Sequence, residues 1–168
     1  MTGDDQGAGP TRLLRLAAQR WLALPRALRL LLPIAIMGVL WWSSSQPAVS
    51  PVGVVRSFGH NAMHVVAWAA LAAAFRFAFG PALLATPAPR ATVAALLLSI
   101  AYGVVDELHQ SHVPGRACSV VDVLSDALGA GLAVTVVDGV AARTWPRLRL
   151  WLLLLAAAVT VGWATFGG

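Results

Sequence analysis

The feature that most constrains this chain is a series of long apolar segments, separated by short stretches that contain proline or glycine. A helix needs about 20 mostly apolar residues to cross a bilayer. The apolar runs are continuous and do not alternate with polar residues, so they predict helices rather than strands of a barrel. We therefore predict an all-α fold, a small polytopic transmembrane bundle of about five helices, at residues 27–45, 62–80, 91–105 (extending at most to 110), 119–137 and 150–166.

Charged side chains are too scarce to cover a soluble globule of this size. They make up 11% of the residues, whereas a soluble domain has about 25%. The mean hydropathy of +0.74 agrees with a membrane protein, and the single cysteine excludes an internal disulfide. All 12 basic residues are arginines lying between apolar blocks. This pattern indicates membrane lipid as a partner and gives no case for nucleic-acid binding.

The arginines also predict an orientation. If the N-terminus is cytoplasmic and all five segments span, ten arginines face the cytoplasm and two, Arg56 and Arg116, face outward. This distribution follows the positive-inside rule. If residues 119–137 did not span, the count would fall to seven against five. The charge count therefore favours a spanning segment there despite its two aspartates.

The N-terminal region has two interpretations. Residues 1–26 form a basic cytoplasmic tail, in which 11–24 is either an interfacial helix or a disordered flank. Residues 27–166 form one transmembrane domain. Alternatively, the first apolar segment is a cleaved signal peptide, which leaves four spanning helices. The long lead and the absence of an Ala-x-Ala site favour an uncleaved anchor.

In this topology, the remaining polar residues converge on the outer side of the membrane. Carboxylates and imidazoles can exchange protons, and a guanidinium can bind a phosphate or carboxylate. The candidate catalytic residues are His64, Asp106, Glu107 and His109. The candidate substrate-binding residues are Gln110, Arg116, Ser119, Asp122 and Asp126.

Helical spacing divides the acids of the third segment. Asp106, His109 and Gln110 stand at i, i+3 and i+4 and share a face, whereas Glu107 points about 100° away. A charged Asp126 facing lipid would cost at least ~2.5–3.5 kcal/mol, so we expect it to face the bundle interior or to be protonated.

Small residues in the fourth segment predict close helix packing. Gly129 lies on the same stripe as the two aspartates, and the face of residues 129–133 could also join two copies of the chain. Two arginines have simple structural interpretations. Arg116 can neutralise one of the nearby acids and fix the loop, and Arg76 can extend to the inner headgroups.

Residues 102–133 resemble the signature of the VanZ-like family of bacterial membrane proteins. That signature has a Tyr-Gly, an Asp-Glu-x-x-Gln, a Pro-Gly-Arg-x-x-Ser and an Asp that opens a Gly-rich helix. The matching positions here are Tyr102-Gly103, Asp106-Glu107 with Gln110, Pro114-Gly115-Arg116 with Ser119, Asp122 and Gly129.

An earlier family block, Asp-Lys-x-x-His-x-x-x-Tyr, is matched only at its histidine, His64. His60 and Asn61 replace the Asp-Lys pair, Trp68 replaces the tyrosine, and Asp126 stands where the family commonly has asparagine. The resemblance implies a bacterial plasma-membrane location and a link to the cell envelope. The founding member is associated with resistance to the glycopeptide antibiotic teicoplanin.

Three functions follow from the outward polar residues and the resemblance. The first is an effect on glycopeptide susceptibility. The second is a membrane-embedded enzyme acting on a lipid-linked or headgroup substrate, and the third is a non-catalytic binder or transporter subunit. The sequence leaves catalysis open. It contains no phosphate loop, Cys pair or His-Glu-x-x-His, and His64, His109 and an acid have no recognised metal spacing, so we expect no cofactor and no metal.

Overall fold

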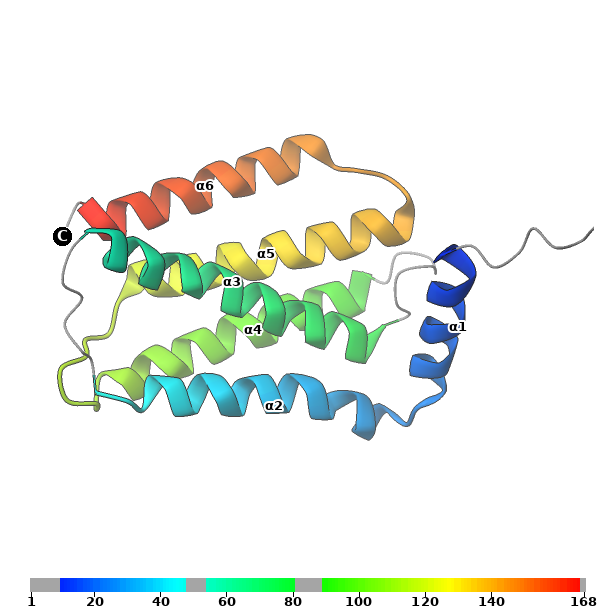
Figure 1. The fold of residues 1–168 in the computed structure, drawn as a ribbon, viewed down its shortest axis with the longest axis horizontal. Helices are drawn as coiled ribbons and strands as arrows, with labels where there is room; N and C mark the ends of the chain where they lie inside the picture. Colours follow the sequence, from blue (N-terminus) through cyan, green and yellow to red (C-terminus); the bar gives the residue numbers. More distant parts are fainter. Residues whose placement is uncertain (1–9, 48–53, 81–88, 167–168) are drawn as a thin grey trace, which may run out of the picture.

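A computed structural model of the chain describes residues 10–47, 54–80 and 89–166. Within these residues every regular element is an α-helix, which confirms the predicted fold class (Figure 1). The helices in chain order are α1 (Pro10–Ala23), α2 (Arg26–Ser44), α3 (Val54–Phe79), α4 (Pro89–Gln110), α5 (Val120–Ala142) and α6 (Arg147–Phe166).

Five helices among the described residues are long and apolar enough to cross a membrane, and each contains most of one predicted segment. Four of them are longer than the minimal prediction, since α3 begins at Val54 and α6 at Arg147, and two extend further at the C-terminal end. α4 continues to Gln110, and α5 continues beyond residue 137 to Ala142. Both extensions contain acidic residues that contact neighbouring helices, so hydropathy underestimates the helix length there.

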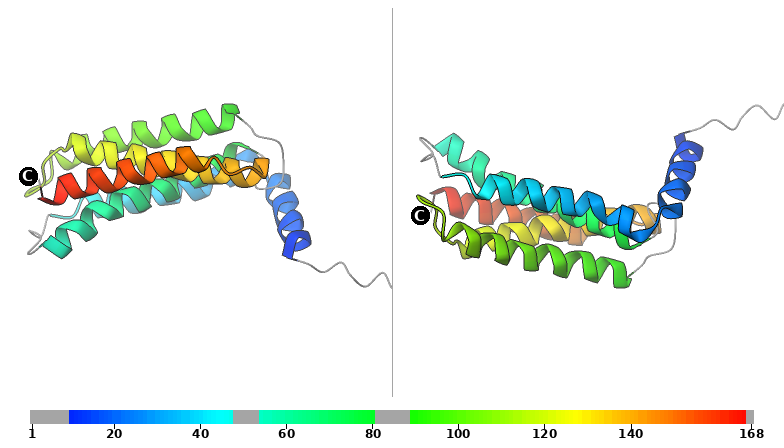
Figure 2. Two further views of the ribbon diagram at one scale, coloured as in Figure 1. Left: turned by 90° about the horizontal axis from the view of Figure 1, so that it is seen from above. Right: turned by 90° about the horizontal axis from the view of Figure 1, so that it is seen from below.

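α3 is the central helix, because it packs against each of the other four apolar helices. These helices run along a common direction, and the two further views show the same arrangement (Figure 2). Trp68, Leu71 and Phe75 of α3 are buried in the core. Large apolar side chains such as Leu31 and Leu155 are exposed on the outer helices, which is the pattern that lipid contact requires.

The predicted close packing at Gly129 occurs within the chain. A Cβ at Gly129 would collide with the backbone carbonyl of Val65 on α3, so glycine is required for this approach of α3 and α5. Gly131 instead faces Leu153 of α6, where a Cβ would make an ordinary contact at 3.5 Å. Association of two copies through residues 129–133 stays a prediction.

α1 lies crosswise to the bundle at one end (Figures 1 and 2). The indole nitrogen of Trp21 donates to the carbonyl of Phe77 on α3 at 2.9 Å, and this bond attaches α1 to the bundle. A helix thus occupies most of residues 11–24, as one interpretation of the sequence predicted. Its position on a membrane surface stays a prediction, and the tail at 1–9 lies outside the described residues.

Candidate functional site

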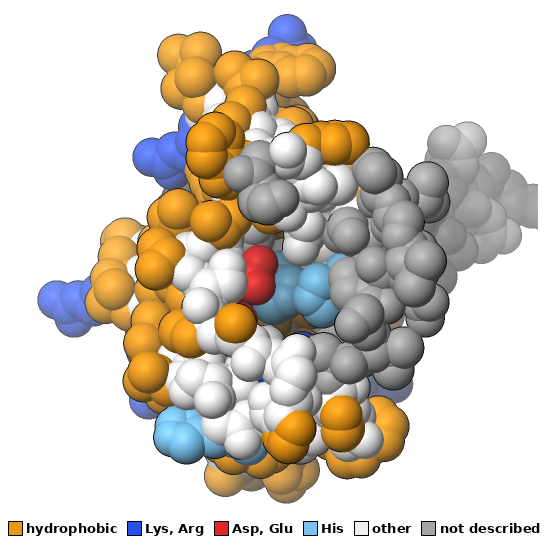
Figure 3. Space-filling model, turned by 90° about the vertical axis from the view of Figure 1, so that its left-hand side faces the viewer, with side chains coloured by type: hydrophobic (Ala, Val, Ile, Leu, Met, Phe, Trp, Pro, Cys, Tyr) orange, Lys and Arg blue, Asp and Glu red, His pale blue; other side chains and the backbone are white. Residues whose placement is uncertain are grey.

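The predicted polar residues gather at the end of the bundle where α4 ends and α5 begins, on the left in Figure 1. We call it the His64 end, and we call the opposite end, beside α1, the Arg76 end. Figure 3 looks onto the His64 end and shows an acidic side chain next to histidine in a hollow near the centre. Hydrophobic side chains lie around much of the margin.

His64 of α3 is the histidine at the centre of this site, and 8% of its surface is exposed. Its Nδ1 atom lies 3.0 Å from Oδ1 of Asp126, which is fully buried on α5. The ring also stacks on Trp68, with centroids 5.7 Å apart. Asp126 therefore faces the bundle interior, as the cost of placing it in lipid predicted, and it fixes the imidazole.

Glu107 reaches the same site from α4 and is 1% exposed. Its Oε2 atom accepts a hydrogen bond from the backbone N–H of Ser119 at 2.8 Å, while Oε1 has no hydrogen-bond partner among the described residues. Ser119 caps α5, because its hydroxyl accepts from the backbone N–H of Asp122 at 3.2 Å. The cap thus links the start of α5 to Glu107.

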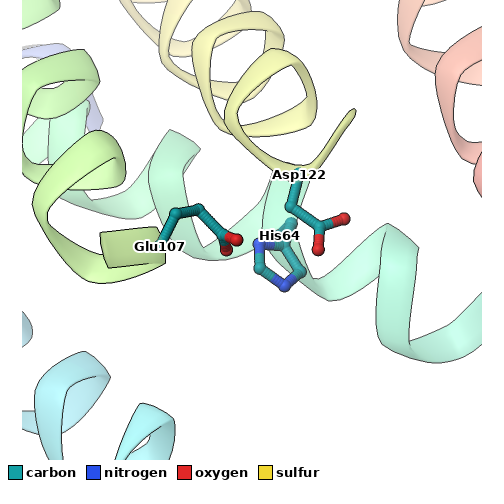
Figure 4. A group of neighbouring side chains, drawn as sticks. All are labelled: His64, Glu107 and Asp122. Carbon is teal, nitrogen blue, oxygen red and sulfur yellow. The ribbon is translucent and has the colours of Figure 1, made fainter. Parts of the chain in front are cut away.

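Side chains from three helices meet in this group. One ligand atom each from His64, Glu107 and Asp122 lies within 4.8 Å of the others. In Figure 4 the imidazole of His64 lies between the two carboxylates, which point toward it from α4 and α5. We call these three residues with Asp126 the His64 cluster.

Asp106 belongs to a separate network on the α2 side of α4. Its Oδ2 atom accepts hydrogen bonds from the hydroxyl of Ser44 at 2.7 Å and from the amide of Gln110 at 2.9 Å. The predicted division of the two adjacent acids between different faces of α4 is therefore observed. Glu107 contacts the His64 cluster, and Asp106 contacts α2.

Arg116 does not form the ion pair that the sequence predicted. Among the described residues, no carboxylate lies within 4 Å of its guanidinium. Instead it donates to Oε1 of Gln110 at 3.1 Å and to the carbonyls of Ser43 and Gln46 at 3.2 and 3.0 Å. The last carbonyls of a helix lack partners within it, so the end of α2 is a favourable acceptor for a cation. Gly115, with φ of 78°, makes the turn that precedes Arg116.

His109 was predicted to share the α4 face of Asp106, and its contacts are with α2. Its ring stacks on Trp41 with centroids 3.8 Å apart, and Nε2 lies 2.9 Å from the hydroxyl of Ser45. Among the described residues, no hydrogen bond or ring contact joins His109 to the His64 cluster.

The cluster lies between two cavities. One, of about 190 Å³, opens between α2, α3 and α4, and its lining includes His64, Asp106 and Arg116. The other, of about 270 Å³, lies beside the start of α5 and the end of α6, and its lining includes Asp122 and Trp163. A small polar ligand can therefore approach the cluster from either side of α3.

The departures from the family pattern also lie at this end. Asn61 donates to the hydroxyl of Thr165 on α6 at 3.1 Å, so it ties α3 to α6. Trp68 donates to the carbonyl of Ser99 at 3.1 Å, besides stacking on His64. His60 packs edge-on against His64, with centroids 5.3 Å apart. These residues position α3 and His64 and add an imidazole at the cavity.

Sequence reasoning missed the serines at the end of α2. Ser44 is buried and binds Asp106, and Ser43 and Ser45 contact Arg116 and His109. The signal for them was three consecutive serines directly after an apolar segment.

A second polar group, also not predicted, lies at the Arg76 end. Arg76 was expected to extend to the headgroups, but its side chain is fully buried. Its Nη2 atom lies 2.8 Å from Oδ1 of Asp138 on α5, and Thr92 of α4 donates to Oδ2 of the same aspartate at 2.6 Å. The small residue Gly80 leaves space for the guanidinium, with which a Cβ there would collide. Arg76 thus pairs with Asp138 inside the bundle and does not extend to the lipid headgroups.

A family model described as VanZ/LLP1 matches residues 29–141. This range covers more than half of the chain, including nearly all of α2 through α5 and every residue of the His64 cluster. α1 and α6 lie outside it. No curated protein and no solved structure matches the chain.

Proposed function

Because the chain belongs to the VanZ/LLP1 family, we propose that it acts in the bacterial cell envelope and alters susceptibility to glycopeptide antibiotics such as teicoplanin. The chain is a multi-pass membrane protein with five apolar helices. The proposed orientation places the N-terminus in the cytoplasm and the His64 end on the outer side of the plasma membrane. Glycopeptides and lipid-linked envelope intermediates meet that side.

The observation that carries this proposal is the His64 cluster with its cavities. Ionisable side chains within a membrane-spanning bundle are costly, and they mark ligand or proton sites more often than structural ones. Here four of them, from three helices, lie at one end, and His64 lines a cavity of about 190 Å³. Arg116 contributes a guanidinium to the wall of that cavity, which suits a phosphate or carboxylate ligand.

The direct test is a teicoplanin susceptibility series in a strain that lacks the protein and in one that overproduces it. We expect the two strains to shift in opposite directions, and Glu107→Gln to fail to restore the deletion strain. His112→Ala, which changes an exposed loop histidine, is the matched control and should restore it. No shift in either strain would contradict the proposal.

A second function, catalysis on a lipid-linked or headgroup substrate, is favoured by the pairing of His64 with Asp126. A carboxylate that orients an imidazole is a common arrangement for general acid–base catalysis. The 3.0 Å contact between them gives this arrangement at the base of the site. His64 would exchange the proton, and Arg116 would bind the anionic headgroup.

The enzyme hypothesis requires a product. Purified protein in proteoliposomes with a lipid-linked cell-wall precursor should convert it to a species of changed mass, and His64→Ala should abolish the conversion. The hypothesis can also be tested in cells with three variants, His64→Ala, Glu107→Gln and Arg116→Ala. If each is expressed normally and each retains the full phenotype, the hypothesis is overturned.

A further inference from the structure

The His64 cluster contains more carboxyl groups than cationic side chains. Glu107, Asp122 and Asp126 supply three carboxylates, and the described residues provide no arginine within 4 Å of them. Arg116, the nearest arginine in the sequence, is bonded to Gln110 and to carbonyls at the end of α2. A bound cation would stabilise these carboxyl groups in their ionised form.

A buried oxygen without a partner points to the same conclusion. Oε1 of Glu107 has no hydrogen-bond partner in the described part of the chain, although Glu107 is 1% exposed. Its carboxylate points toward His64 (Figure 4). An uncompensated buried carboxylate oxygen costs more than a neutral one, so native structures supply a partner, and an ion is one such partner.

Two of the cluster's side chains are held in place by hydrogen bonds, as ligands of metal sites are. Ser119 fixes one oxygen of Glu107, and Asp126 fixes the ring of His64. Bonds of this kind to ligating groups set their orientation and strengthen metal affinity. The imidazole favours a transition metal over Mg²⁺ or Ca²⁺, which prefer oxygen ligands throughout.

We propose that His64, Glu107 and Asp122 bind a divalent transition-metal cation, with Zn²⁺ as the expected ion. Their ligand atoms lie within 4.8 Å of one another. Bonds of about 2.0–2.2 Å to zinc place tetrahedral ligands roughly 3.4 Å apart, so binding requires these atoms to approach one another by at most about 1.4 Å. Three protein ligands leave a fourth position for water or an anionic ligand from the cavity. The inference rests on the proposed function in treating this cluster as the ligand site.

The sequence did not predict this site because the three ligands lie on three helices. The set considered from sequence paired His64 with His109, whereas the structure places His109 against Trp41 and Ser45. Spacing along the chain identifies ligands that share one helix or loop. It does not identify ligands that are 43 and 15 residues apart, as His64, Glu107 and Asp122 are.

The test uses the full chain purified in detergent with an affinity tag free of histidine, stripped with a chelator and titrated with ZnCl₂. We expect one zinc per chain by elemental analysis. His64→Ala, Glu107→Gln and Asp122→Asn should each weaken binding by at least about tenfold. His112→Ala is the control for adventitious binding by an exposed histidine and should bind like the parent chain.

Cobalt substitution provides a second readout on folded protein. The parent chain should give the visible absorption of a tetrahedral or five-coordinate Co²⁺ site, and Asp122→Asn should change the spectrum. Asp122 is only partly buried, so this variant is the least disruptive of the three. Absence of stoichiometric binding, or binding that persists in all three variants, would overturn the proposal.

Metal content and antibiotic phenotype are separate measurements. The protein could bind zinc through these ligands and yet have no effect on teicoplanin susceptibility. That result would support the metal site and contradict the proposed function. Loss of the phenotype in Glu107→Gln, with no zinc bound by the parent chain, would reject the metal site and retain the proposed function.

Discussion

Both ends of the bundle contain buried ionisable side chains, but these side chains have different partners at the two ends. At the Arg76 end a buried arginine contacts an aspartate at 2.8 Å, and Thr92 bonds the other oxygen of that aspartate. At the His64 end three carboxylates surround one imidazole, and Oε1 of Glu107 lacks a partner among the described residues. At the first end the aspartate has an arginine partner, whereas at the second end three carboxyl groups share one imidazole. The comparison agrees with a structural role for the first pair and with the proposed cation site at the second cluster.

The largest expected effect is at the Arg76 end. Asp138→Ala leaves Arg76 buried without its carboxylate, and we expect a loss of about 3 kcal/mol in the free energy of unfolding. Unfolding in detergent, followed by circular dichroism, measures it. The double variant Arg76→Met/Asp138→Leu replaces both charges with apolar groups and should recover most of the loss. A single variant as stable as the parent chain would refute a structural role for the pair.

A smaller loss of stability should follow a substitution at the contact of α3 and α5, between the two ends of the bundle. Gly129→Ala places a methyl group against the carbonyl of Val65, and overpacking of this kind costs about 1–3 kcal/mol. The same unfolding measurement applies. The control is Gly162→Ala on α6, where nothing lies within 4 Å of the added Cβ. Equal stability of the two variants would show that α3 and α5 do not require glycine at this contact.

A substitution in the His64 cluster should have a different result. Glu107→Gln removes one negative charge and keeps the oxygen that accepts from Ser119. With a chelator present, we expect stability equal to that of the parent chain or higher by about 1 kcal/mol. With zinc present, the parent chain should be the more stable of the two, because ligand binding to the folded state adds stability. A loss as large as that of Asp138→Ala would make the cluster structural.

The smallest effect is expected at His109. His109→Ala removes a ring stack on Trp41 and a bond to Ser45, which together contribute about 1 kcal/mol. Zinc binding should be unchanged, in contrast to His64→Ala. If His109→Ala instead abolished zinc binding, the division of the two histidines between separate networks would be wrong.

Hydropathy and helical angle predicted the parts of the structure that depend on one helix at a time. They gave the five apolar helices, and they separated Asp106 from Glu107 by their directions around α4. The cost of an ionised side chain in lipid gave two options for Asp126, an interior position or protonation, and the structure places it in the interior. Each of these inferences needs only the axial position of a residue and its direction about its own helix.

Hydropathy and helical angle did not predict which residues of different helices contact each other. Arg76 and Asp138 are 62 residues apart, and their pairing depends on how α3 and α5 are rotated against each other. Arg116 had several acids nearby in the sequence, yet the carbonyls at the end of α2 are its partners. Gly129 predicted a close neighbour without indicating that the neighbour is α3 of the same chain.

The most direct test of a functional His64 end is teicoplanin susceptibility in a deletion strain that expresses Glu107→Gln, with the folded protein quantified in the same membranes. We predict protein at the parental level and no restoration of the phenotype. A variant that folds normally and restores the phenotype fully would contradict the functional assignment of the His64 cluster.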